Sequence, residues 1–77
     1  MNKTTRARLH TLDSRINEIA DELHELADEE QDKSNNLPES LQESPQGEAL
    51  NESVDNLEYA AAQAAELISL VDDCTGA

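Results

Sequence analysis

The side chains with the clearest chemical potential in this sequence are carboxylates crowded into one segment. Eight acids fall within the 15 residues from Glu18 to Asp32. Carboxylates at helical spacing can hold a divalent cation, or they can imitate the phosphates of a nucleic acid and occupy a basic groove of a protein. A solvated helical face accounts for the same residues. The acids that we predict to contact a protein partner are Glu18, Asp21, Glu22, Glu25, Asp28, Glu29, Glu52 and Asp55.

The remaining reactive residue types form no catalytic pattern. Cys74 is the only cysteine, so the chain contains no internal disulfide. His10 and His24 are 14 positions apart, which is about 21 Å along a helix and too far to share one ion. We therefore expect no catalytic residue, no cofactor and no metal site. Solvated histidines and a small apolar Cys74 are the expected roles of these three residues.

The charge of the chain restricts its partners. The formal net charge is −13 in 77 residues, and four of the five Lys and Arg lie within residues 1–15. Nucleic acids and anionic membranes bind clustered basic residues, so neither is expected as a direct partner. No apolar run approaches the ~18 residues of a membrane span, and no signal peptide is evident. A cytoplasmic protein that binds a basic protein surface fits this balance.

The elements that must position these acids are two long helices. Helix-forming residues dominate, and both prolines and one of the two glycines lie between residues 37 and 48. We predict one all-α domain over residues 1–77, an antiparallel hairpin with helices at about 4–33 and 45–73 and a connector at 34–44. Apolar residues repeat in steps of three and four in both helices. The two predicted seams are Leu9, Leu12, Ile16, Ile19, Leu23 and Leu26, and Leu50, Val54, Leu57, Ala61, Ala64, Ile68 and Val71.

Local signals mark the helix ends. Thr4 or Thr5 is expected to cap the first helix, and Ser44 followed by Pro45 is expected to start the second. Gly76 stands where the second helix would end. In the connector, Pro38 is placed to start one short helical turn that folds Leu37 and Leu41 over the adjacent end of the hairpin.

One antiparallel register aligns both seams. Facing residues then have numbers that sum to 80, as for Leu9 with Val71 and Ile16 with Ala64. This register also brings Arg6 and Arg8 toward Asp72 and Asp73.

A single hairpin of this length buries little apolar surface, so we expect a second copy to complete the core. Apolar residues beside the seams widen each stripe beyond the strict heptad pattern, as in helix bundles. We predict a homodimer that forms a four-helix bundle. The predicted oligomer interface consists of Ala20, Ala27, Ala60, Leu67, Leu70 and Cys74.

The connector resembles a segment of known small proteins. Its residues Asn36-Leu37-Pro38-Glu39, Leu41-Gln42, Ser44 and Gly47-Glu48, followed by a second helix, are similar to a stretch in small acidic helical-hairpin proteins of bacteriophages and prophages. The resemblance covers roughly residues 16–70, and Pro45 departs from the charged residue expected there. These proteins are functionally uncharacterised, so the resemblance implies an accessory protein in the bacterial host cytoplasm and transfers no site residues.

The expected function is therefore binding rather than catalysis. The leading hypothesis is a phage-type protein that binds and inhibits a basic host or defence protein, with its acids imitating a nucleic acid. The alternative is a homo-oligomeric structural or regulatory module whose acids only confer solubility. A third hypothesis is a metal-dependent nucleotide hydrolase, since helical pyrophosphohydrolases hold magnesium on such acids, or a sponge for signalling nucleotides.

Overall fold

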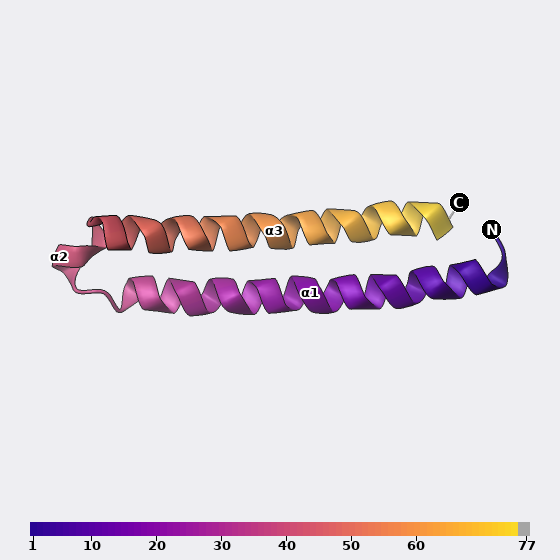
Figure 1. The fold of residues 1–77 in the computed structure, drawn as a ribbon, viewed down its shortest axis with the longest axis horizontal. Coiled ribbons are helices and arrows are strands. Elements are labelled where there is room, and N and C mark those ends of the chain that lie inside the picture. The colour runs from indigo at the N-terminus through magenta and orange to yellow at the C-terminus, as the bar shows by residue number, and fades with distance from the viewer. Residues whose placement is uncertain (76–77) are drawn as a thin grey trace.

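The protein is a long hairpin of two helices joined by one short helical turn. The computed structural model describes residues 1–75, in which α1 spans Lys3–Asn35, α2 spans Glu39–Gln42 and α3 spans Pro45–Thr75. α1 and α3 lie side by side and run in opposite directions, with α2 at one end (Figure 1). The all-α hairpin is confirmed, and so is the short helix after Pro38. The predicted role of Gly76 lies outside the described residues.

The hairpin is a thin rod. Its extents are 59 × 15 × 12 Å and its radius of gyration is 17.5 Å, against about 11–12 Å for a compact chain of this length. Only Ala20, Ala27, Val54 and Ala61 are buried apolar residues among those described, and no large side chain is fully buried. Because little apolar surface is removed from water within one chain, much of it remains available for a partner.

The interior seam of α3 is the predicted one, but the seam of α1 is only half right. All seven predicted residues of α3 are buried or half-buried. On α1, Leu9, Ile16 and Leu23 are half-buried as predicted. The second row of the α1 seam is instead Asp13, Ala20 and Ala27, and the predicted residues Leu12, Ile19 and Leu26 are 44%, 53% and 46% exposed. A row with two alanines leaves room for α3 to approach closely, which a row of large side chains does not.

The register differs from the prediction by five residues, about 1.4 helical turns. The Ser34 hydroxyl donates a hydrogen bond of 3.0 Å to the side-chain oxygen of Asn51, so facing numbers sum to 85 rather than 80. Arg6 and Arg8, which the predicted register brought toward Asp72 and Asp73, form no ion pair with them. The only ion pair in residues 1–75 joins Lys33 to Glu30, at 2.9 Å.

Side-chain caps fix the starts of both long helices. The Asn2 side chain accepts a 2.8 Å hydrogen bond from the backbone N–H of Thr5, so Asn2 caps α1 in place of the predicted Thr4 or Thr5. At α3 the prediction is confirmed, because the Ser44 hydroxyl accepts from the backbone N–H of Gly47 at 3.4 Å. These bonds satisfy N–H groups that have no partner within a helix.

The connector packs against the start of α3 through Gly47. This glycine is buried, and a Cβ at its position would lie 2.1 Å from the carbonyl oxygen of Gln42 and 2.7 Å from that of Leu41. Only a residue without a side chain therefore allows α2 to turn so tightly onto α3. Of the two connector leucines, Leu37 is half-buried and Leu41 stays 38% exposed, so the predicted apolar cover is only partly formed.

Candidate protein-interaction surfaces

One side of the hairpin carries apolar side chains that are exposed or half-buried, and we call it the apolar face. Leu26 of α1 and Ser53 of α3 line the same groove, so the α1 row that continues through Leu12 and Ile19 lies beside the α3 row that continues through Ala60 and Leu67. Leu67 and Leu70 are 47% and 56% exposed. We define the apolar face as Leu12, Ile19, Leu26, Ala60, Leu67 and Leu70.

The predicted oligomer interface is corrected at two positions. Ala20 and Ala27 are 8% and 3% exposed and lie inside the hairpin, so they cannot meet another copy. The other four predicted residues, Ala60, Leu67, Leu70 and Cys74, are half-buried or exposed, and the apolar face contains the first three of them. Leu12, Ile19 and Leu26, which sequence reasoning assigned to the seam, take the place of the two alanines on the surface.

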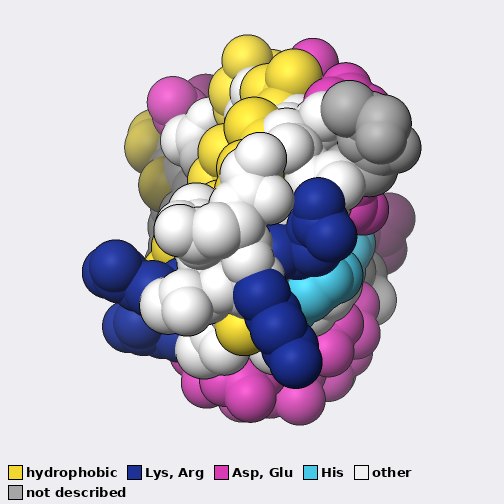
Figure 2. Space-filling view, turned by 90° about the vertical axis from the view of Figure 1, so that its right-hand side faces the viewer, with side chains coloured by type: hydrophobic (Ala, Val, Ile, Leu, Met, Phe, Trp, Pro, Cys, Tyr) yellow, Lys and Arg dark blue, Asp and Glu magenta, His cyan; other side chains and the backbone are white. Residues whose placement is uncertain are grey.

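The acids of α1 occupy two different positions around the helix. Glu18, Asp21, Glu25, Asp28 and Asp32 lie on the side of α1 turned away from α3, and all are exposed. We call these five residues the acidic face. Seen along the rod from the end opposite α2, the largest group of acidic side chains lies at the bottom, and hydrophobic ones lie along the top and left with further acidic side chains beside them (Figure 2). The acidic face and the apolar face therefore lie on different sides of α1.

The other predicted contact acids lie away from this face. Glu22 and Glu29 are seven residues apart on α1, in the row of Arg8 and Arg15 that flanks the apolar face. Glu52 and Asp55 are exposed on α3, on the other helix. The structure thus brings together Glu18, Asp21, Glu25 and Asp28 of the predicted set.

Asp13 is an acid placed inside the seam, which sequence reasoning missed. Its Oδ1 atom is buried and has no hydrogen-bond partner in the described chain. When Asp13 is protonated, its carboxyl can donate a hydrogen bond to the Asp72 carboxylate. This hydrogen bond, desolvation and the negative charge of Asp72 raise the pKa of Asp13 above its usual value, and His10 opposes the shift. The sequence did contain a signal for this position, because Asp13 is four residues after Leu9 and three before Ile16, the spacing of a seam residue.

The raised pKa of Asp13 predicts that the hairpin gains stability in acid. Protonated Asp13 contributes its full stabilisation of the fold below the unfolded-state pKa of about 4. This contribution is lost as the pH rises through the higher pKa of Asp13 in the folded state. We expect Asp13→Asn to raise the melting temperature by a few degrees at pH 7 and to change it little at pH 4. Circular dichroism melts at both pH values measure this, with Asp21→Asn as the exposed control. An Asp13→Asn gain no larger than the control's would contradict the assignment.

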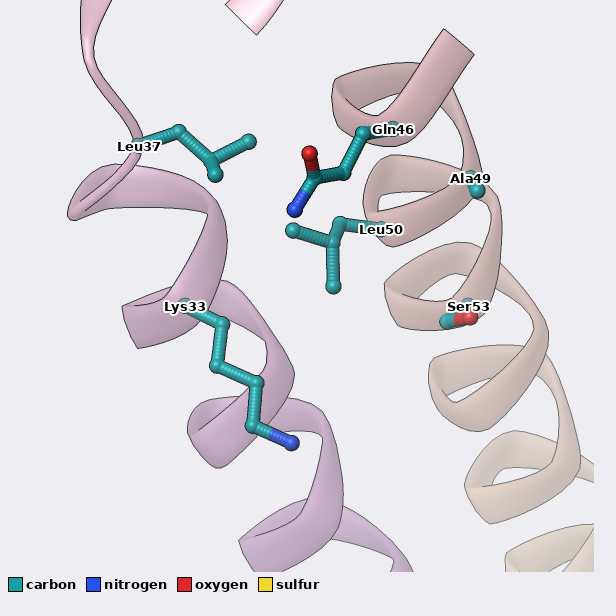
Figure 3. A pocket seen from close by; sticks show the side chains of 6 residues that line it. All are labelled: Lys33, Leu37, Gln46, Ala49, Leu50 and Ser53. Carbon is teal, nitrogen blue, oxygen red and sulfur yellow. The ribbon is translucent and has the colours of Figure 1, made fainter. Parts of the chain in front are cut away.

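The grooves of the surface offer little for catalysis. The groove at the connector end holds about 370 Å³, and Leu37, Gln46 and Leu50 point into it (Figure 3). Its one charged residue, Lys33, is paired with Glu30, and this contact raises the pKa of Lys33. Within residues 1–75 no three His, Cys, Asp or Glu side chains are grouped to hold a metal ion. The free Cys74 is exposed and donates to the carbonyl oxygen of Leu70 at 3.5 Å.

None of the helices in the described part of the chain combines the length and the apolar character needed to cross a membrane. No family model, curated protein or solved structure matches the chain. Its own surfaces are therefore the basis for the function proposed below.

Proposed function

We propose that this chain is a homodimeric protein-interaction protein whose acidic face binds a basic surface of another protein. The observation that supports this most directly is that the carboxylates of the acidic face are exposed and form no ion pair within residues 1–75. After Arg15 the sequence contains Lys33 as its only Lys or Arg, and Lys33 pairs with Glu30. Unpaired carboxylates of one sign create a field that attracts a positively charged surface.

The density of these carboxylates supports nucleic-acid mimicry. The five acids of the acidic face lie within the 15 residues from Glu18 to Asp32, which gives about one charge per 4.5 Å along α1, against about one per 3.4 Å along each strand of duplex DNA. A basic groove built for phosphates would meet a similar line of charge. With the resemblance of the connector to phage proteins, we propose a host or defence protein in the bacterial cytoplasm as the partner, inhibited by occupation of its groove.

Charge reversal on the acidic face tests this function. We expect Asp21→Lys/Glu25→Lys to weaken binding to a partner captured from bacterial lysate at low salt by about tenfold or more, because like charges then face each other. The matched control is Glu66→Lys/Asp73→Lys, which makes the same change in net charge at exposed sites of α3. Binding is measured by titration calorimetry with the captured protein, identified by mass spectrometry. Equal losses in both variants would contradict a specific role for the acidic face.

Salt provides an independent check of the same proposal. The Debye length falls from about 10 Å at 0.1 M salt to about 3 Å at 1 M, so an association steered by exposed charges weakens steeply over this range. A dissociation constant that stays flat would show that the partner is held by other contacts.

A second candidate function is a homo-oligomeric structural or regulatory module, and the apolar face favours it. In that case the acids act only as a solvated surface. The same charge-reversal variant separates the two candidates, because a module keeps its assembly and activity while an acidic decoy loses its partner.

A further inference from the structure

We propose that a second copy of this chain covers the apolar face in the antiparallel orientation, with a twofold axis passing beside Ile19. This inference rests on the homodimer of the proposed function and adds which face is covered and which way the second copy runs. It is independent of the acidic face and of any basic partner.

The α1 part of the apolar face reads the same in both directions. Leu12, Ile19 and Leu26 are spaced by seven residues, with the β-branched residue at the centre. An antiparallel second α1 therefore sets Ile19 against Ile19, and Leu12 of each copy against Leu26 of the other. A C2 interface needs a surface that is complementary to itself, and this row meets that requirement.

The charges beside this row decide the direction. The adjacent row of α1 reads Arg8, Arg15, Glu22 and Glu29, again in steps of seven. With the axis at Ile19, Arg8 meets Glu29 of the second copy and Arg15 meets Glu22, and each pair occurs twice. Two hairpins stacked with their connectors at the same end would instead bring the acid-rich halves together. Opposite charges flanking an apolar seam set helix orientation in this way in coiled coils.

The shape of the face fits the same arrangement. One groove, of about 220 Å³, is lined by Arg8, Thr11, Leu12 and Arg15, and another, of about 390 Å³, contains Leu26 in its wall. The two grooves lie on either side of Ile19. In the antiparallel dimer, Leu26 of the second copy therefore comes to the groove at Leu12, and Leu12 of the second copy comes to the groove at Leu26. A face 59 Å long and 12–15 Å wide offers an area comparable to the ~800 Å² that each partner buries in a standard interface.

Oligomeric mass gives the first test. We expect the wild-type chain to sediment as a dimer and Ile19→Asp to sediment as a monomer, because the carboxylate would meet its copy at the axis. The matched control is Tyr59→Asp. Tyr59 is 68% exposed and lies midway between the seam residues Leu57 and Ala61, on the outer side of α3. A monomeric wild type, or equal effects of both substitutions, would overturn the proposal.

Cross-linking tests the orientation without destabilising the chain. In a Cys74→Ser background we expect a short bis-maleimide to join two Ile19→Cys chains efficiently. Leu12→Cys and Leu26→Cys should each cross-link poorly alone and well when mixed. Efficient linkage of Leu12→Cys to itself, or none for Ile19→Cys, would overturn the antiparallel arrangement while leaving the proposed binding by the acidic face untouched.

A charge exchange tests the flanking pairs. Arg15→Glu is expected to raise the dimer dissociation constant by about tenfold, since two attractive pairs become repulsive. Glu22→Arg is expected to do the same, and Arg15→Glu/Glu22→Arg is expected to restore the wild-type value. A double variant as weak as either single one would show that these residues do not pair across the axis.

Discussion

Glutamate in place of Ala61 is expected to unfold the hairpin, whereas glutamate at the neighbouring Ala62 is expected to leave it folded. Ala61 is 1% exposed in the α3 seam, and Ala62 is exposed. An unpaired charge in a dry interface costs about 3–5 kcal/mol or more. A chain of this size has only about 4–12 kcal/mol of stability in total. Far-ultraviolet circular dichroism at neutral pH measures the helix that remains.

The Ala62 variant makes this comparison specific. Both substitutions introduce the same helix-forming residue and the same charge at adjacent positions, so helix propensity and net charge are matched. The difference between them is whether the side chain lies between α1 and α3. Equal helix content and melting temperature in the two variants would contradict the packing of α1 against this row of α3.

Replacing Gly47 with alanine is expected to cost about 2 kcal/mol of unfolding free energy, in the range of overpacked sites. The added Cβ would lie 2.1 Å from the Gln42 carbonyl oxygen, so the backbone of α2 has to move away from α3. This movement would also weaken the nearby hydrogen bond between the side chains of Ser34 and Asn51. Urea unfolding followed by circular dichroism gives the free energy.

The sign of the Gly47 effect is informative because helix propensity opposes it. Alanine is better than glycine in a helix by about 1 kcal/mol, so a chain free of the clash would be stabilised. Gln46→Ala, one residue earlier at an exposed site of the same first turn, is the control and should change stability by less than about 0.5 kcal/mol. A Gly47→Ala chain that unfolds at higher urea than the wild type would rule out the tight connector.

The sequence was sufficient to predict the helices and one seam. The spacing of Leu50, Val54 and Leu57 with the residues that follow marked the main apolar seam on α3, and Pro38 and Pro45 marked the connector. On α1 the row that begins at Leu9 is flanked on one side by the row of Leu12 and on the other by the row of Asp13, Ala20 and Ala27. Hydrophobicity alone favoured the row of Leu12, which has the larger side chains, as the second row of the seam.

The choice between these two α1 rows depends on packing, which spacing does not reveal. Ala20 and Ala27 let the helices approach closely, and the cost is Asp13 in the seam. That choice turns Ile19 outward and shifts the register by five residues. The acids were found from composition, but their division between the acidic face and the row of Glu22 and Glu29 follows only once the interior side of α1 is known.

An intrachain cross-link tests this assignment most directly, because the apolar face and the acidic face both depend on which side of α1 meets α3. In a Cys74→Ser background, Ser34→Cys/Asn51→Cys is expected to form a disulfide within one chain under mild oxidation, since the two native side chains lie 3.0 Å apart. Mass spectrometry of the monomer band on a non-reducing gel identifies the product. Failure of this pair, together with efficient bridging of Ser34→Cys/Gln46→Cys, would contradict the register and the outward position of Ile19.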